Sequence, residues 1–293
     1  MMLVVAGPAS PMLSERISEL LEADLVNVEW KLFPDGESYI RLPRDLKGER
    51  VIVVQSNPPP QDKRLMELFL MLNLVRDLGA SEVFAVVPYL AYMRQDKRFR
   101  SGEPVSIGVV AKLLECVGVD AVVLVDAHSK AVLEHFDVDV IEVSAMPLIG
   151  DFLAKMKLSN PFVLAPDFKA YSMIKVVAQR LGAPCDYLMK VRDKVTGEVE
   201  TIFKEVDVKG REVIIVDDII STGGTIANAT KISLDLGAKC VYASCTHALM
   251  VGNAFNKLKR AGVREVIGTD TIENKFSKVS VAPVIAHALK RAL

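Results

Sequence analysis

The 293-residue chain has no excess of charge of either sign, because 36 lysine and arginine residues are balanced by 37 aspartate and glutamate residues. Proteins that coat DNA or bind a membrane surface need a basic excess, so we expect neither nucleic acid nor membrane among the partners. The four cysteines form no CxxC pair, which is typical of reduced residues in an intracellular protein. No apolar run reaches the roughly 18 residues that span a bilayer, and the apolar N-terminal stretch is too short for a signal peptide. The sequence therefore predicts a soluble, cytoplasmic protein.

The composition, with 51% hydrophobic and 25% charged residues, excludes a disordered or collagen-like chain and leaves a globular one. Short β-branched segments alternate with segments of helical period. Strands are expected at 51–55, 82–87, 121–125, 140–143, 162–165, 187–191, 212–216, 240–245 and 265–267. Helices are expected at 64–78, 105–117, 171–181, 225–236, 254–261 and 282–293. Because this alternation needs crossover connections, we expect an α/β fold with mostly parallel sheets and helices on both faces.

The length is about twice that of a common domain, which indicates two domains. We place the first at residues 1–145, joined by the final helix, and the second at 146–281. VVLVDAHS at 122–129 matches VIIVDDIIS at 213–221 in character, which favours an internal duplication over chance similarity between two buried strands.

The segment VDDIISTGGT, residues 216–225, has the most specific chemistry. It is neither a Walker A loop nor a dinucleotide GxGxxG motif. Its glycines allow successive N–H groups to surround a phosphate at a helix N-terminus. The predicted phosphate contacts are Ser221, Thr222, Gly223, Gly224 and Thr225. Asp217 and Asp218 would repel a phosphate unless they had other partners, and ribose hydroxyls are good donors to both, so a sugar phosphate fits better than a solvated aspartate pair.

MRQDKRFR, residues 93–100, gathers four cations after a predicted strand end. Most charge runs are solvated loops, but this one lies at the carboxyl edge of the sheet, where open α/β folds bind ligands. Arg94 and Lys97 are therefore candidates to hold a nucleotide triphosphate, with Gln95 adding a neutral amide.

Lys190 and Arg192 lie on one face of a predicted strand end and open a polar stretch that contains a glycine. Two cations in this position suit a lid that stabilises a reacting phosphate in the transition state. A sheet edge protected by lysine is the structural alternative.

Asp126 and His128 follow one predicted strand, and Asp167 ends the strand that we take as its equivalent in the second half. Together they would form a site for Mg²⁺, which phosphoryl transfer from ATP requires. Mg²⁺ prefers oxygen ligands, so a contact of His128 through water is expected. A purely structural histidine is the alternative.

VDDIISTGGT is similar to the phosphoribosyl-binding motif of type I phosphoribosyltransferases and of the ribose-phosphate pyrophosphokinases. Other segments resemble the pyrophosphokinases, in order along essentially the whole chain: FPDGE (33–37), RQDK (94–97), VDAHS (125–129), APD (165–167), KVRD (190–193), TDTI (269–272) and SVAPVIAHAL (280–289). The short loops are similar to those of the archaeal branch. The resemblance implies two similar domains of the type I phosphoribosyltransferase-like fold. It also implies a Mg²⁺-dependent enzyme that makes 5-phosphoribosyl 1-pyrophosphate and AMP from ATP and ribose 5-phosphate, for nucleotide biosynthesis.

The resemblance also implies residue roles. By composition, residues 33–42 are only a hairpin tip. In the family this loop reaches the ATP of a neighbouring subunit, so a homo-oligomer is expected. ATP would be bound by Phe33, Asp35, Gly36, Glu37, Arg94, Gln95, Asp96 and Lys97. His128 and Asp167 would bind magnesium, Lys190 would be catalytic with Arg192 beside it, and Arg192 would also contact ribose 5-phosphate.

This chain departs from the family after Asp167, where Phe168, Lys169 and Ala170 replace a glycine-rich run, which puts the local backbone contacts in doubt. Two alternatives remain. A phosphoribosyltransferase would share VDDIISTGGT but has no need of FPDGE, RQDK or a second α/β half. A non-catalytic regulatory relative would bind nucleotide, but retention of Lys190, Arg192, His128 and Asp167 argues against it.

Overall fold

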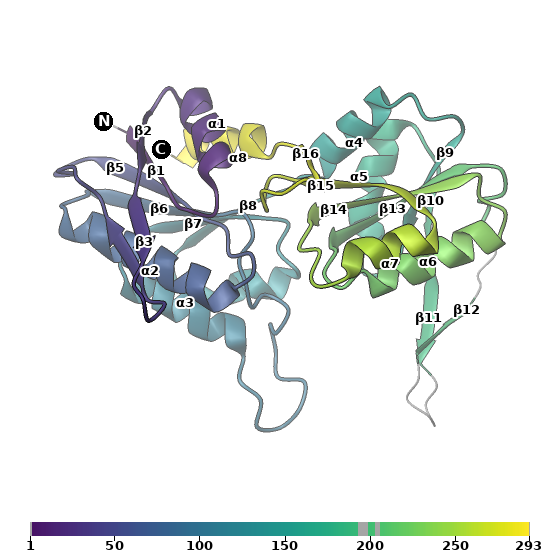
Figure 1. Cartoon of the computed structure of the whole chain (residues 1–293), viewed down its shortest axis with the longest axis horizontal. Coiled ribbons are helices and arrows are strands. Elements are labelled where there is room, and N and C mark those ends of the chain that lie inside the picture. Colours follow the sequence, from purple (N-terminus) through teal and green to yellow (C-terminus); the bar gives the residue numbers. More distant parts are fainter. Residues whose placement is uncertain (1, 193–198, 203–205, 293) are drawn as a thin grey trace. The chain divides into compact units, whose positions relative to one another are not determined.

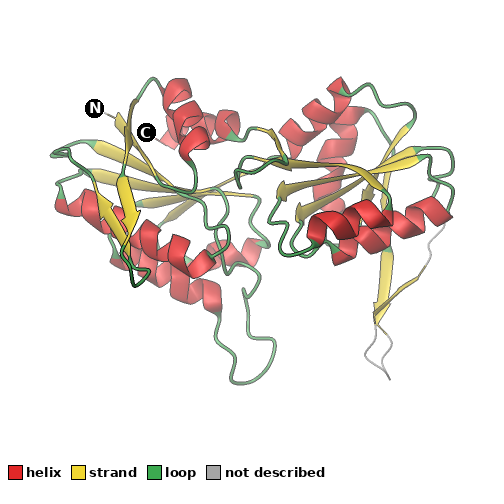
Figure 2. Ribbon diagram, in the orientation of Figure 1, coloured by secondary structure: helices red, strands yellow, loops and turns green. Residues whose placement is uncertain are grey.

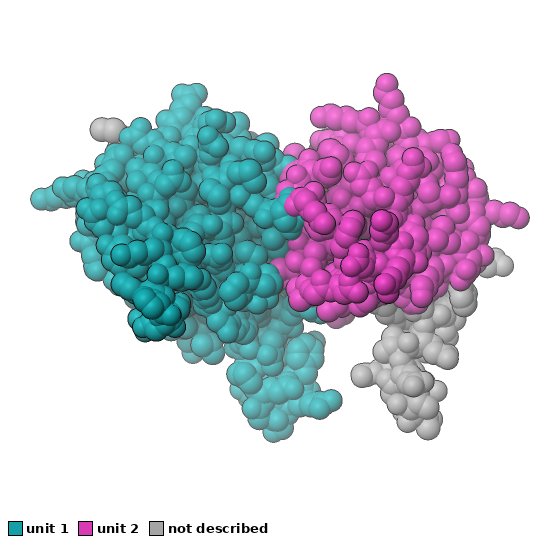
Figure 3. Space-filling model, viewed as in Figure 1, with its two compact units in different colours: residues 1–144, 270–274, 280–293 teal, residues 145–269, 275–279 magenta. Residues whose placement is uncertain are grey.

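The computed structural model describes residues 2–192, 199–202 and 206–292 of the chain, with the backbone alone at 189–192 and 199–202. The chain divides into two compact units (Figure 3). Unit 1 comprises residues 1–144, 270–274 and 280–293, and unit 2 comprises residues 145–269 and 275–279.

Unit 1 is built on a six-stranded parallel sheet in the order β2-β1-β5-β6-β7-β8 (Figure 1). Its strands are β1 (Met2–Ala6), β2 (Asp24–Asn27), β5 (Arg50–Val54), β6 (Glu82–Val87), β7 (Ala121–Val125) and β8 (Asp139–Val143). Its helices are α1 (Pro11–Leu21), α2 (Gln61–Asp77), α3 (Ser106–Cys116), the 3-10 helix η1 (Lys130–His135) and α8 (Ala282–Ala292). Helices α1 and α8 cover one face of the sheet, and α2 and α3 cover the other.

Unit 2 repeats this design, with helices packed on a sheet (Figure 2). Its sheet is parallel, in the order β10-β9-β13-β14-β15-β16. Its strands are β9 (Pro161–Ala165), β10 (Cys185–Tyr187), β13 (Glu212–Ile219), β14 (Cys240–His247), β15 (Val263–Thr269) and β16 (Ser277–Val279). Its helices are α4 (Met146–Lys155), α5 (Tyr171–Leu181), α6 (Gly224–Asp235) and α7 (Ala254–Ala261). The pair α4 and α5 lies on one face, and the pair α6 and α7 lies on the other.

Both sheets have the same strand order, because the second strand along the chain is at one edge and the first lies between it and the third. Each unit also carries an antiparallel ribbon between its second and third sheet strands. These ribbons are β3 (Glu29–Leu32) with β4 (Ser38–Arg41), and β11 (Met189–Arg192) with β12 (Val199–Ile202). Shared topology down to this insertion supports an internal duplication.

The predicted match between residues 122–129 and 213–221 is nevertheless wrong, because the two segments contain strands that are not equivalent. Residues 122–129 include β7, the fifth strand of its sheet, whereas residues 213–221 include β13, the third. The topological equivalent of β13 is β5, and that of β7 is β15. Asp167 follows β9, which corresponds to β1 and not to β7. Buried parallel strands are all rich in valine and isoleucine, so composition alone does not distinguish them.

The expected alternation of strands and helices is confirmed. Helices α5 and α7 have the predicted bounds, because each ends at a glycine in the left-handed conformation, Gly182 with φ +66° and Gly262 with φ +100°. The prediction of a single strand at 187–191 is wrong, because the chain leaves the sheet there. β10 ends at Tyr187, and β11 begins at Met189 in the separate ribbon. Among the described helices, none has the length and apolarity needed to cross a membrane.

Candidate active site

The phosphate-binding turn predicted in unit 2 lies between β13 and α6. The Ser221 carbonyl accepts a hydrogen bond from Val251 N at 3.0 Å, which ties the turn to the segment before α7. Gly223 has φ +72°, and a Cβ atom there would lie 3.3 Å from the Leu258 side chain, so both conformation and space require glycine. Within the described residues no side chain caps the start of α6 at Gly224. The turn therefore presents the positive end of a helix, which favours an anion.

Asp217 and Asp218 form a pair of carboxylates just before this turn. The Asp218 N–H donates to Asp217 Oδ1 at 3.0 Å, which fixes one carboxylate against the backbone of the other. Burial raises the pKa of Asp217 well above its ordinary value, and the charges of Asp218 and Asp167 raise it further. Hydroxyl donors or a cation would stabilise the ionised form of this carboxyl group. The pair therefore suits a sugar bound beside the phosphate turn.

Asp167 lies at the same sheet edge, because β9 and β13 are neighbouring parallel strands. Its Oδ1 accepts hydrogen bonds from Lys169 N at 3.0 Å and Ala170 N at 3.3 Å, which shape the turn into α5. The exposed Phe168 ring packs edge-on against Tyr187, with the ring centroids 5.1 Å apart. In this chain the residues that replace the glycine-rich run thus still form a tight turn around the Asp167 carboxylate.

The other predicted cations of unit 2 are described only in part. Lys190 and Arg192 lie on β11, where Lys190 pairs with Thr201 in the antiparallel ribbon. Their side chains lie outside the described part of the structure, so their predicted catalytic roles stay predictions.

In unit 1 the structure brings the segment RQDK next to the end of β7. The Ser129 hydroxyl donates to Asp96 Oδ2, and His135 Nε2 lies 2.8 Å from the Asp96 carbonyl oxygen. The Ser129 hydrogen bond lowers the pKa of Asp96, and the charges of His128 and Lys97 act in the same direction. Two segments about 30 residues apart in sequence therefore form one polar cluster. The Asp96 side chain holds the loop in place, and its predicted contact with ATP stays a prediction.

The loop that follows β6 presents its cations to solvent. Arg94 and Lys97 are exposed, and Lys97 Nζ lies 5.6 Å from the centre of the Phe99 ring. Gln95 Oε1 accepts a hydrogen bond from the Ser106 hydroxyl at 2.8 Å, so α3 anchors the start of the loop. Glu103, which the sequence reasoning missed, closes the loop by accepting from the N–H groups of residues 99 and 100 at 3.1 and 3.0 Å.

The predicted magnesium residues belong to different units. Asp126, next to His128, has a left-handed backbone with φ +42°, which turns the chain sharply after β7 and leaves His128 exposed. Glu142 supports this turn by accepting from Ala127 N at 3.2 Å. Among the described residues no group of three or more His, Cys, Asp or Glu side chains is arranged to hold a metal by itself. The magnesium assignment therefore stays a prediction.

The FPDGE segment is the tip of the β3–β4 hairpin, as predicted. Phe33 N donates to the Glu37 carbonyl at 2.8 Å, and Gly36, with φ +95°, donates to the Phe33 carbonyl at 2.9 Å. The Asp35 side chain accepts from Glu37 N at 3.2 Å. Phe33 packs edge-on against Tyr39, yet 41% of it is exposed. An aromatic ring and two carboxylates thus stand together on a small projecting tip.

A residue that positions this hairpin, on helix α2, was not predicted from the sequence. Glu67 on α2 is fully buried, and its Oε1 accepts from Trp30 Nε1 on β3 and from Ser38 Oγ on β4, both at 2.9 Å. Its Oε2 accepts from Arg64 at 2.7 Å and from Gln55 at 3.2 Å. A lone carboxylate inside the apolar run LMELFLML was the available signal.

Comparisons with known proteins cover both units. The family model described as the N-terminal domain of ribose phosphate pyrophosphokinase matches residues 2–118, and the phosphoribosyl transferase domain model matches residues 139–281. A ribose-phosphate pyrophosphokinase of Sulfolobus acidocaldarius is 45% identical over 97% of each chain. One of Methanothermobacter thermautotrophicus is 45% identical over 98% of this chain and all of its own. The crystal structure of a phosphoribosylpyrophosphate synthetase from Mycobacterium smegmatis has a TM-score of 0.88 and 30% identity, covering 99% of this chain and 98% of its own.

Proposed function

The chain belongs to the ribose-phosphate pyrophosphokinase family, and from that premise we propose that it uses ATP, ribose 5-phosphate and Mg²⁺ to make 5-phosphoribosyl 1-pyrophosphate and AMP. The observation that carries the sugar-phosphate half of the proposal is the uncapped helix start at Gly224 beside the Asp217 and Asp218 pair. The turn binds the 5-phosphate through its N–H groups, and the two carboxylates accept hydrogen bonds from ribose hydroxyls.

The transfer is an in-line displacement at phosphorus. The C1 hydroxyl oxygen of ribose 5-phosphate attacks the β-phosphorus of ATP and loses its proton to solvent, while the bond from the β-phosphorus to the bridging α,β-oxygen breaks and AMP leaves. Lys190 and Arg192 neutralise charge on the transferring group. Positioning and electrostatics supply most of the catalysis in such a reaction, so no strong general base is required.

Mg²⁺ fits the carboxylates of unit 2. The charges of Asp218 and Asp167 both raise the pKa of Asp217, so this sheet edge carries more negative charge than it neutralises. Mg²⁺ usually takes one or two protein carboxylates and completes its shell with waters and substrate phosphates, which agrees with the lack of a complete protein ligand set among the described residues. We assign Asp167 as a ligand and His128 as a contact through water. When bound, the ion neutralises charge on the phosphates.

ATP is assigned to unit 1. Arg94 and Lys97 lie exposed on the loop that Asp96 anchors to the end of β7, so this loop offers two cations for the triphosphate. The hairpin tip adds Phe33 for the adenine face, with Asp35 and Glu37 for its polar edge. We further propose that the hairpin serves the ATP of a neighbouring subunit, so that the active enzyme is a homo-oligomer.

The reaction is tested by incubating the purified protein with ATP, ribose 5-phosphate and Mg²⁺ and following the phosphorus NMR signals. Appearance of AMP with a sugar-linked diphosphate supports the proposal. Formation of ADP, or no turnover by the folded protein, would refute it. A chelator should abolish turnover.

The role of Lys190 has a separate test. Lys190→Ala should lower kcat by about 10²- to 10³-fold, the usual loss when one transition-state donor is removed. The affinity for ribose 5-phosphate should stay within about two-fold, because the charge acts in the transition state. Lys155→Ala, at an exposed position at the end of α4, is the matched control and should leave both values unchanged. Equal losses in kcat and in affinity would contradict the transition-state role.

Sharing of the ATP site is tested by complementation. Phe33→Ala and Lys190→Ala are each prepared as inactive or weakly active proteins, dissociated, mixed and reassembled. If the hairpin serves a neighbour, some sites in the mixed oligomer combine an intact hairpin with an intact lysine, roughly a quarter of them for randomly paired dimers. No recovery after reassembly would show that the hairpin serves its own subunit.

A further inference from the structure

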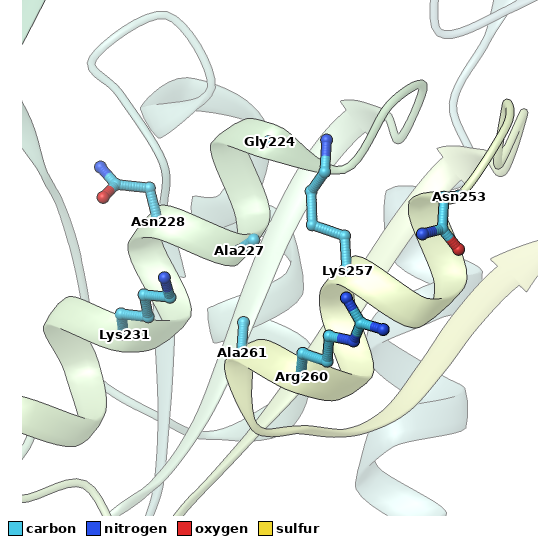
Figure 4. Close-up of a pocket in the computed structure, with 8 residues that line it drawn as sticks. All are labelled: Gly224, Ala227, Asn228, Lys231, Asn253, Lys257, Arg260 and Ala261. Atoms are coloured by element: carbon cyan, nitrogen blue, oxygen red, sulfur yellow. The ribbon is translucent and has the colours of Figure 1, made fainter.

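Helices α6 and α7 lie side by side on one face of unit 2 and leave an open groove of about 430 Å³ between them (Figure 4). The lining comes from two helix faces and the residue before α7: Gly224, Ala227, Asn228, Lys231, Asn253, Lys257, Arg260 and Ala261. Residues 224, 227 or 228 and 231 on α6, and 257 and 260 or 261 on α7, follow one another at intervals of three or four, as residues on one face do. The groove is therefore a continuous surface made by two well-defined helices.

Small side chains line the middle of the groove, and cationic side chains line its two sides. Ala227 and Ala261 have no side-chain bulk beyond Cβ, which keeps the space between the helices open. Lys231 stands on α6, and Lys257 and Arg260 stand one turn apart on α7 (Figure 4). Among the described residues that line the groove, none carries a carboxylate.

The three cations have no salt-bridge partner among the residues that the structure describes. Like charges three residues apart on a helix repel each other, and the helix dipole at the end of α7 offsets part of this repulsion for Arg260. Lys257 extends toward the end of α6 that carries Gly224, where the helix dipole adds further positive potential (Figure 4). The whole groove therefore attracts negative charge.

The groove extends well beyond the predicted sugar-phosphate turn. Lys231 is seven residues after Gly224, which is about 10 Å along a helix axis. One phosphate bound before Gly224 does not reach that far. The two lysines and Arg260 thus provide cationic contacts that the proposed reaction does not use.

We propose that the groove between α6 and α7 is a second anion site, which binds a small molecule that carries two or more linked phosphate groups. Three cations on two facing helices match an extended polyphosphate better than a single phosphate. The side-chain oxygen of Asn253 accepts a hydrogen bond from Asn256 at 2.6 Å, which leaves its NH₂ group as a neutral donor at the same end. Because the groove is open to solvent, binding is electrostatic and should weaken as salt increases.

The proposal is tested with tripolyphosphate as the probe, by calorimetric titration of the full chain. Saturating ribose 5-phosphate and a non-hydrolysable ATP analogue are present, so that both substrate sites are filled. The wild type should bind one tripolyphosphate per chain, more tightly than inorganic phosphate. The double variant Lys231→Gln with Arg260→Gln should lose about ten-fold or more in affinity, since two charged contacts are removed.

Lys259→Gln is the matched control, because Lys259 is exposed on α7 beside Arg260 but does not line the groove. It should stay within about two-fold of the wild type, since a charge outside the groove is screened by solvent. All substituted side chains are exposed, and unchanged circular dichroism confirms the fold of each variant. Absence of an additional binding event would overturn the proposal, as would equal affinity in the double variant and the control. Binding of a short oligonucleotide without binding of tripolyphosphate would overturn the small-anion assignment.

Discussion

The buried Glu67 carboxylate gives the sharpest test of how the hairpin is held. All four residues of β3 are exposed, so the hairpin gains little from apolar burial. One oxygen of Glu67 binds both hairpin strands, through Trp30 and Ser38, and the other binds Arg64 and Gln55. Both carboxylate oxygens are thus fully engaged by donors. We therefore expect the substitution Glu67→Gln to release the hairpin.

The magnitude follows from the chemistry of the amide that replaces the carboxylate. In one orientation the NH₂ group of this amide faces the Arg64 and Gln55 donors, and both hydrogen bonds are lost. In the other it faces Trp30 and Ser38, and the Trp30 bond is lost while the Ser38 hydroxyl can rotate to accept. In both orientations Arg64, whose side chain is 20% exposed, loses its counter-charge. Each loss of this kind costs about 1 to 3 kcal/mol, and relaxation recovers part of it, so we expect the hairpin to be about 2 to 4 kcal/mol less stable. At about 1.4 kcal/mol per factor of ten, its amides should exchange roughly 30- to 700-fold faster.

Hydrogen exchange followed by mass spectrometry measures this directly on peptides that cover residues 29–41. A peptide covering β7 serves as the internal reference and should keep its wild-type rate. Glu82→Gln is the matched control, because the Arg50–Glu82 pair is a surface ion pair with 50% and 35% of the side chains exposed. It should change exchange by no more than a few-fold. If the hairpin of a folded Glu67→Gln protein exchanges at the wild-type rate, the carboxylate does not hold it.

Two further predictions concern unit 2. Because burial raises the pKa of Asp217 above its ordinary 3.8, ionising it costs stability as pH rises above that value, so Asp217→Asn should raise the thermal unfolding temperature at pH 7 in chelator-treated buffer, with a gain that vanishes near pH 4. Calorimetry over this range checks it, and a gain that does not depend on pH would contradict the shift. Gly223→Ala should cost about 1 to 2 kcal/mol of stability and weaken ribose 5-phosphate binding, whereas Gly210→Ala, at φ +73° with no atom within 4 Å of the added Cβ, should cost stability alone. Unchanged ribose 5-phosphate affinity in Gly223→Ala would show that the turn does not bind the phosphate.

Sequence patterns predicted the features that depend on neighbours in the chain. The bounds of α5 and α7 follow from local periodicity and a glycine at the end of each helix, and the turn before Gly224 is a contiguous motif. The helix ends and the turn each depend on about ten consecutive residues, and backbone conformation is their main constraint.

Features that depend on the sheet order were not predicted. The hydrogen bond between Ser129 and Asp96 joins residues 33 positions apart. The hydrogen bonds of Glu67 join α2 to β3, to β4 and to Gln55, which follows β5. The first strand, Met2–Ala6, was missed because an apolar N-terminal stretch has no strand alternation when both faces are buried. For the hydrogen bonds, the missing information is which strands and helices are neighbours in space.

The corrected strand equivalence explains how two halves of one topology diverged in chemistry. Near its end β13 carries Asp217 and Asp218, and the glycine turn follows, so this strand end presents two carboxylates and an uncapped helix start. After the equivalent β5 the chain continues with Gln55 and Ser56, which are fully buried. Gln55 donates to Glu67 and accepts from Ala9 N at 3.0 Å, and the Ser56 hydroxyl donates to the Thr271 carbonyl.

Unit 1 therefore has neutral, hydrogen-bonded side chains at the position where unit 2 carries the aspartate pair. The Gln55 side chain and the Ser56 hydroxyl already have partners inside the fold, so neither is available to a ligand. The same network connects through Glu67 to the hairpin, so this strand end supports a projecting loop. Gln55→Asp should loosen the hairpin as Glu67→Gln does, because a second carboxylate would then face Glu67.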